Sequence, residues 1–144
     1  MISSSLKLPD RWQELQSAAR AAREQAWAPY SRFPVGAAIL TDCGEIFVGC
    51  NVENSSSGLT ICAERTAVGA AVSQGYRRFS AIWISLAGTP LPCGACRQVL
   101  AEFNPELLLI LDQVDRTDNS PPEIVPLSAL LPRPFRLQRE DHSP

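Results

Sequence analysis

The chain has 144 residues, of which 45% are hydrophobic and 19% are charged, and its formal net charge is −2. This composition is typical of a globular domain and excludes a disordered chain. The slightly acidic balance disfavours a nucleic-acid partner, because proteins that grip phosphate backbones usually carry a basic surface.

The predicted elements begin with a helix and a hairpin. Pro9–Trp27 has apolar residues at helical spacing, and Pro29 is expected to end this helix. Two apolar runs, Val35–Leu40 and Ile46–Val48, flank an Asp-x-Gly turn and predict a β-hairpin. Asn, Ser and Gly are frequent in Asn51–Thr60, which is therefore expected to be a loop.

The second half of the chain alternates between helix and strand. Its expected elements are a helix at about Ile61–Ser73, a strand at Ala81–Leu86, a helix at Ala95–Phe103, a strand at Leu107–Leu111, a short strand at Ile124–Val125 and a helical turn at Ser128–Leu131. Together with the hairpin, this alternation predicts an α/β fold, a three-layer domain with a mixed, roughly five-stranded sheet flanked by helices.

We expect a single domain over residues 1–144, with its core at about 9–135 and a flexible tail at 138–144. No stretch reaches the ~20 apolar residues that cross a bilayer, and the first residues lack the pattern of a signal peptide. The sequence therefore predicts a soluble, cytoplasmic protein without a membrane partner.

Three of the five cysteines form a metal-ligand pattern. Cys62 and the C-x-x-C pair Cys93 and Cys96 lie at or near the starts of predicted helices, where unpaired backbone N–H groups favour the zinc-binding thiolate. Three ligands leave a fourth position for water, which is typical of a catalytic rather than a structural zinc site. His142, two residues from the C-terminus, would close the site in a non-catalytic zinc module, and a dithiol switch at the C-x-x-C is the remaining alternative.

Charged residues accompany these cysteines. Glu64 stands two residues after Cys62, so its carboxylate can reach a water at the open position and transfer its proton. The simpler interpretation of Glu64 is a solvated glutamate at a helix N-terminus. Arg65 and Arg97 directly follow the ligand segments, and we expect one or both to donate hydrogen bonds to ligand sulfur, the alternative being two surface arginines.

The motifs Cys62-Ala-Glu-Arg65 and Pro92-Cys-Gly-Ala-Cys-Arg-Gln98 resemble the signature of cytidine deaminases, in its three-cysteine form. Residues 29–38, 49–54 and 66–67 also resemble the small, homotetrameric branch of that family. The resemblance implies one Zn²⁺ per subunit and a homotetramer with sites shared between subunits. It also implies hydrolytic deamination of cytidine and deoxycytidine to uridine and deoxyuridine, with release of ammonia, as in pyrimidine salvage.

The resemblance implies roles for six residues. Glu64 would be the general acid/base, and Asn51 and Glu53 would hold the ribose hydroxyls. Phe33 would stack on the pyrimidine, and backbone groups near Ala63 would meet the exocyclic amine. Phe135 would reach a neighbouring subunit's pocket.

The chain departs from the family pattern at three places. Ser57 stands where a tyrosine is usual, Leu91 where a serine is common, and Arg136-Leu-Gln-Arg follows Phe135 in place of an acidic, glycine-containing stretch. These departures leave open a different aminated ring, such as a modified cytosine nucleoside or a nucleoside antibiotic, as the substrate. A nucleic-acid-editing deaminase would need a basic groove beside the site.

Overall fold

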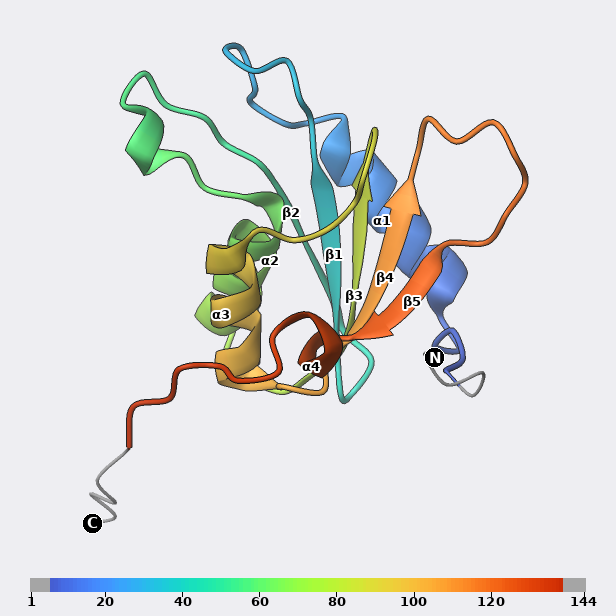
Figure 1. Cartoon of the computed structure of the whole chain (residues 1–144), viewed down its shortest axis with the longest axis vertical. Helices are drawn as coiled ribbons and strands as arrows, with labels where there is room; N and C mark the ends of the chain where they lie inside the picture. Colours follow the sequence, from blue (N-terminus) through green and yellow to red (C-terminus); the bar gives the residue numbers. More distant parts are fainter. Residues whose placement is uncertain (1–5, 139–144) are drawn as a thin grey trace.

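The computed structural model describes residues 6–138, and its helices lie on both faces of a five-stranded sheet (Figure 1). In chain order the elements are α1 (Trp12–Arg23), β1 (Gly36–Thr41), β2 (Ile46–Cys50), the 3₁₀ turn η1 (Ser57–Leu59), α2 (Ala63–Ser73), β3 (Phe79–Leu86), α3 (Gly94–Phe103), β4 (Leu108–Gln113), β5 (Glu123–Pro126) and α4 (Leu127–Leu130). The three-layer α/β architecture expected from the sequence is confirmed.

The sheet is mixed, with the strand order β2-β1-β3-β4-β5. β1 pairs antiparallel with both β2 and β3, and β4 pairs antiparallel with β5. β3 and β4 are parallel, and α3 forms the crossover between them. The loop that leaves the end of β3 therefore leads directly to the N-terminus of α3, and this junction carries Cys93.

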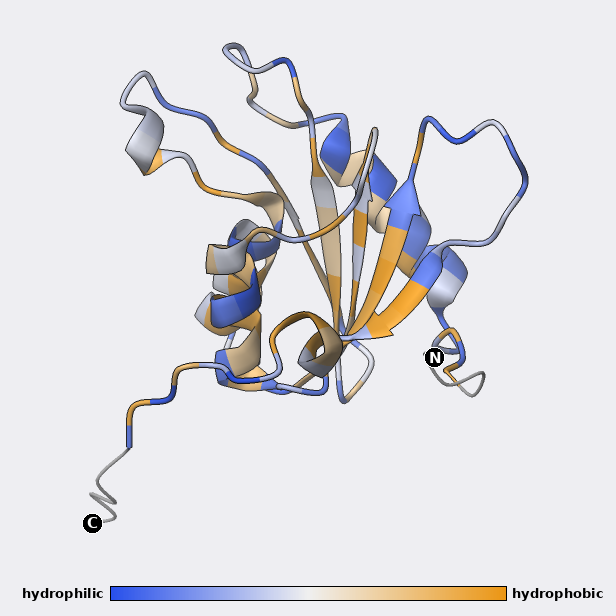
Figure 2. Cartoon of the chain, in the orientation of Figure 1, coloured by the Kyte–Doolittle hydropathy of each residue, from blue (hydrophilic) through white to orange (hydrophobic). Residues whose placement is uncertain are grey.

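Apolar side chains fill both spaces between the sheet and the helices. Leu15 and Ala19 of α1 pack against Trp83 and Ile110 on one face of the sheet, while α2 and α3 cover the other face. All six residues of β1 are buried, as expected for a central strand that is covered on both sides. Figure 2 shows hydrophobic residues along the central strands, and hydrophilic residues alternating with less polar ones along α1.

Helix α1 is shorter than the sequence predicts, and the expectation that Pro29 ends it is wrong. The helix ends at Arg23, because the backbone of Trp27 pairs with the loop that follows β2. Trp27 N–H donates to Asn51 O at 3.0 Å, and Glu53 N–H donates to Trp27 O at 2.8 Å. This pairing brings the segment after α1 beside a loop that contains two of the predicted site residues.

The tail expected at 138–144 lies, except for Gln138, outside the described residues, and so does His142. Within residues 6–138, none of the helices combines the length and apolar character that a membrane span requires.

Candidate functional site

The three cysteines predicted as ligands converge where α2 and α3 begin. Cys62 and Cys93 are the N-cap residues of these two helices, and Cys96 lies in the first turn of α3. The Cys62 and Cys93 sulfurs are 3.9 Å apart, the Cys93 and Cys96 sulfurs are 3.4 Å apart, and all three lie within 4.8 Å of one another. Tetrahedral zinc with bonds of about 2.3 Å sets its sulfurs about 3.8 Å apart, so the cluster fits a zinc ion.

The surroundings of the cluster favour a thiolate at Cys62. A hydrogen bond from the Cys96 thiol and another from Arg65 lower the pKa of Cys62 to about 5, against the opposing effect of burial. The hydrogen bond to Cys62, together with burial, raises the pKa of Cys96. Without a metal the cluster therefore retains a proton, and a bound dication would displace it because zinc binds the deprotonated thiol.

The two arginines make different contacts. Arg65 Nη2 donates to Cys62 Sγ at 3.6 Å and to Thr60 O at 3.3 Å, and its buried Nε has no hydrogen-bond partner among the described residues. Arg97 instead donates to two backbone carbonyls, Pro92 O at 3.0 Å and Leu130 O at 2.9 Å. A sulfur contact is thus found for Arg65, whereas Arg97 stabilises the turn that precedes Cys93.

Glu64 lies in the first turn of α2, and its side chain is only 4% exposed. The simpler interpretation, a solvated glutamate, therefore does not hold. Burial raises the pKa of Glu64, and the nearby Cys62 thiolate raises it further. A carboxyl group with a raised pKa can both accept and return a proton near neutral pH, as a general acid/base must.

A pocket of about 390 Å³ opens beside the cysteines, within the size range of small-molecule sites. Its lining residues come from the loop before β1, the loop after β2, the start of α2, the end of β3 and the β3–α3 loop. They are Ser31, Phe33, Val35, Asn51, Glu53, Thr60, Cys62, Ala63, Glu64, Leu86, Leu91 and Cys93. The pocket thus brings together Glu64, two of the candidate metal ligands and the four residues Phe33, Asn51, Glu53 and Ala63 predicted to contact substrate.

Two polar residues are fixed in the pocket wall by backbone groups. Asn51 Oδ1 accepts a hydrogen bond from Val35 N–H at 2.8 Å, and Asn51 Nδ2 donates to Phe33 O at 2.8 Å. The Glu53 carboxylate accepts from Tyr30 N–H at 2.8 Å and from the backbone and hydroxyl of Ser31. The Ser31 hydroxyl and these N–H groups lower the pKa of Glu53, so an ionised carboxylate faces the pocket.

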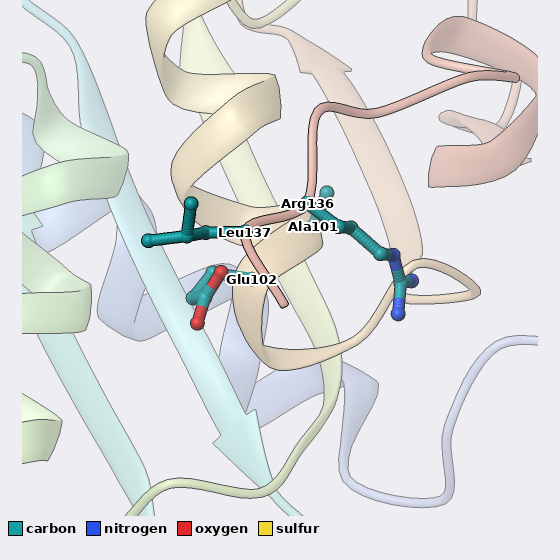
Figure 3. Close-up of a pocket in the computed structure, with 4 residues that line it drawn as sticks. All are labelled: Ala101, Glu102, Arg136 and Leu137. Atoms are coloured by element: carbon teal, nitrogen blue, oxygen red, sulfur yellow. The ribbon is translucent and has the colours of Figure 1, made fainter. Parts of the chain in front are cut away.

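Phe135 does not contribute to this pocket within one chain. Its side chain is 72% exposed, and its backbone oxygen accepts a hydrogen bond from Gln98 Nε2 at 2.9 Å. Its role in a neighbouring subunit stays a prediction. The segment after it borders a second hollow with Ala101 and Glu102 of α3, in which the guanidinium of Arg136 points away from the carboxylate of Glu102 (Figure 3).

Sequence reasoning assigned no role to four residues that line the pocket, namely Ser31, Val35, Thr60 and Leu86. Val35 and Leu86 are ordinary apolar residues next to or at the end of strands, so nothing in their type marks them. Ser31 follows Tyr30 in a segment that resembles the family, which is the one sequence signal that points to it.

Comparison with known proteins identifies relatives of the whole fold and of the metal region. The family described as "Cytidine and deoxycytidylate deaminase zinc-binding region" matches residues 10–111. A cytidine deaminase of Sporosarcina psychrophila is 54% identical over 93 residues, which are 63% of this chain and 68% of that protein. The crystal structure of cytidine deaminase from Burkholderia pseudomallei, 46% identical, superposes with a TM-score of 0.79 over 85% of this chain and 98% of that one. That of Mycobacterium tuberculosis, 41% identical, gives 0.73 over 90% and 100%.

Proposed function

The chain belongs to the cytidine and deoxycytidylate deaminase family, and from this premise we propose that it hydrolyses cytidine and deoxycytidine to uridine, deoxyuridine and ammonia. One observation carries the proposal beyond family membership. The buried Glu64 carboxyl group lines the same pocket as Cys62 and Cys93, so a proton-transferring group and a metal cluster meet at one wall.

We propose Cys62, Cys93 and Cys96 as the ligands of one zinc ion per subunit, which the spacing of their sulfurs supports. When bound, zinc supplies a Lewis acid that lowers the pKa of a water molecule to about 7. Glu64 takes a proton from the attacking water and delivers it to the ring nitrogen beside C4, and then assists protonation of the leaving amine. One water is consumed, the C4–N bond breaks and ammonia leaves.

The other pocket residues orient the nucleoside. Asn51 and Glu53 hold the ribose hydroxyls, Phe33 stacks on the pyrimidine ring, and backbone groups near Ala63 meet the exocyclic amine. Arg65 donates to the Cys62 sulfur and so offsets the negative charge that three thiolates place around a dication.

The test is a substrate panel on protein of known zinc content, with ammonia and ultraviolet absorbance as readouts. We expect deamination of cytidine and deoxycytidine, and a Glu64→Gln variant that keeps its zinc but loses about 10²–10⁴-fold in kcat. Glu123→Gln, at an exposed position on β5, is the matched control and should retain wild-type rates. Failure to release ammonia from either nucleoside would overturn the proposed substrate, and preference for another aminated ring would replace it.

We also propose that the chain acts in the cytoplasm as a homotetramer with shared sites. Trp27, Val52 and Ile61 are exposed apolar residues joined by backbone bridges beside the pocket loops, and Phe135 is exposed as well. Covering these residues by another subunit would remove apolar surface from water. Light scattering should give four times the chain mass of 15.7 kDa, and a monomer would contradict the shared site. The free cysteines suit a reducing compartment.

A further inference from the structure

We propose that Ser31 is a positioning residue for sugar recognition, because its one hydroxyl group joins the backbone of Phe33 to the carboxylate of Glu53. The inference rests on the proposed function, since it concerns how the same pocket would recognise the ribose of a pyrimidine nucleoside. It assigns a specific task to a residue that carries no chemistry of its own at the reacting carbon.

The contacts of Ser31 run in two directions. Its hydroxyl donates to Glu53 Oε1 and accepts a hydrogen bond from Phe33 N–H at 3.1 Å. Its own N–H donates to Glu53 Oε2 at 3.2 Å, beside the 2.8 Å bond from Tyr30 N–H. Both oxygens of Glu53 are thereby oriented by the loop that also carries the aromatic ring of Phe33.

The backbone between the two ends of this link is strained. Arg32, which separates Ser31 from Phe33, has φ = +55°, a left-handed conformation that a side chain with a Cβ adopts rarely. Such a conformation persists only where the surrounding structure holds it in place. The Ser31 hydroxyl accepts a hydrogen bond from Phe33 N–H on the other side of Arg32, and Arg32 N–H donates to Ala28 O at 3.0 Å. The link therefore holds Phe33 in its place at the pocket as well as Glu53.

None of the hydrogen bonds found for Ser31 reaches the cysteines or Glu64. A loss of the hydroxyl should consequently disturb the binding of the sugar and leave proton transfer intact. Replacing a residue that only stabilised the fold would instead change the kinetic constants of all substrates alike, or would change kcat and KM together and lower the melting temperature.

The experiment compares Ser31→Ala with Ser31→Thr, which keeps the hydroxyl, in the full-length, zinc-loaded protein. The matched control is Ser128→Ala, because Ser128 Oγ donates to Glu106 Oε2 at 2.7 Å in the same kind of serine–glutamate pair far from the pocket lining. Each protein is assayed with cytidine and with 2′,3′-dideoxycytidine. Binding of uridine and 2′,3′-dideoxyuridine is measured by calorimetry, which needs no turnover.

For Ser31→Ala we expect the KM of cytidine and the Kd of uridine to rise about 10-fold, with kcat within about twofold of wild type. The KM and Kd of the dideoxy compounds, which lack the 2′- and 3′-hydroxyls, should change less than about twofold. Ser31→Thr should restore most of the uridine affinity. Equal losses for both sugar types, or no loss for either, would overturn the proposal. If the wild type fails to deaminate cytidine yet shows this binding pattern, the proposed reaction fails and the role of Ser31 stands. A wild type that neither deaminates cytidine nor binds uridine would overturn both.

Discussion

At the scale of single residues, the pocket combines polar groups for a sugar with apolar groups for a ring. Asn51 and Glu53 are polar, whereas Phe33, Leu86 and Leu91 are apolar members of the same lining. A site of this kind takes most of its affinity from apolar contact and its orientation from a few polar groups. Leu91 is 48% exposed, so it covers the pocket only in part and has room to change without disturbing the core.

Replacing Leu91 by serine should therefore weaken substrate binding without slowing the chemical step. Loss of about half of the apolar area of a leucine corresponds to ~1 kcal/mol, or about a fivefold rise in the KM of cytidine, while kcat stays within about twofold. Steady-state kinetics on wild type and Leu91→Ser measures both constants. Val48→Ser, on β2 at a side chain that is 44% exposed and outside this pocket, should leave both unchanged. A fall in kcat at constant KM would place Leu91 in the chemistry instead.

At the scale of elements, two glycines let helices lie unusually close to strands. A Cβ on Gly49 of β2 would stand 2.3 Å from Ala67 N and 2.5 Å from Ala63 O, both in the backbone of α2. A Cβ on Gly36 of β1 would stand 2.0 Å from Ala19 O in α1. The first of these contacts sets the position of the α2 N-terminus, and so of Cys62 and Glu64 relative to the pocket.

Gly49→Ala should consequently damage both the fold and the metal site. Because the atoms that would clash belong to a helix backbone, relief requires α2 to move, and we expect a loss of about 1–3 kcal/mol in the free energy of unfolding. The displaced helix should also bind zinc more weakly, which competition with a chromogenic chelator measures.

Gly69→Ala is the matched control on the exposed side of α2, where an added Cβ meets nothing within 4 Å. It should stabilise the helix by about 0.5–1 kcal/mol and leave zinc affinity unchanged. Equal zinc affinity in Gly49→Ala and wild type would show that the close approach does not position the metal site.

At the scale of the whole molecule, the sequence predicts what depends on local spacing and fails where distant segments meet. The cysteine cluster and the alternation of helix and strand follow from short motifs and periodicity, and the structure agrees with them. The early end of α1 depends on Trp27 pairing with a loop that is 24 or more residues away. The link between Ser31 and Glu53 and the position of Arg97 likewise depend on tertiary contacts that no local pattern encodes.

Another feature of that kind joins α1 to the sheet. Asp112, 5% exposed near the end of β4, accepts two hydrogen bonds from Arg20 at 2.8 Å each, one from Trp83 Nε1 at 3.0 Å and one from Ser85 Oγ at 2.7 Å. Burial alone would raise the pKa of Asp112, but these hydrogen bonds and the charge of Arg20 outweigh it and hold the pKa below its ordinary value of 3.8. One carboxylate thus connects helix, central strand and neighbouring strand.

This network should make part of the stability depend on pH in the acid range. Because the pKa of Asp112 is lower in the folded than in the unfolded chain, its contribution is complete above the unfolded value of about 3.9 and is lost as the pH falls through the folded value.

Asp112→Asn should lower the free energy of unfolding by about 2 kcal/mol at pH 7, since the partly exposed Arg20 loses its partner while Trp83 keeps an acceptor. The difference between variant and wild type should begin to shrink below pH ~4, where Asp112 of the unfolded chain takes up its proton, and should shrink further as the pH falls toward the lower pKa of the folded state. Urea titrations from pH 7 to 3 measure this difference, with Asp118→Asn on the exposed β4–β5 loop as a control that should stay within about 0.5 kcal/mol of wild type. A difference that is independent of pH would show that Asp112 stabilises the fold through packing and not through its charge.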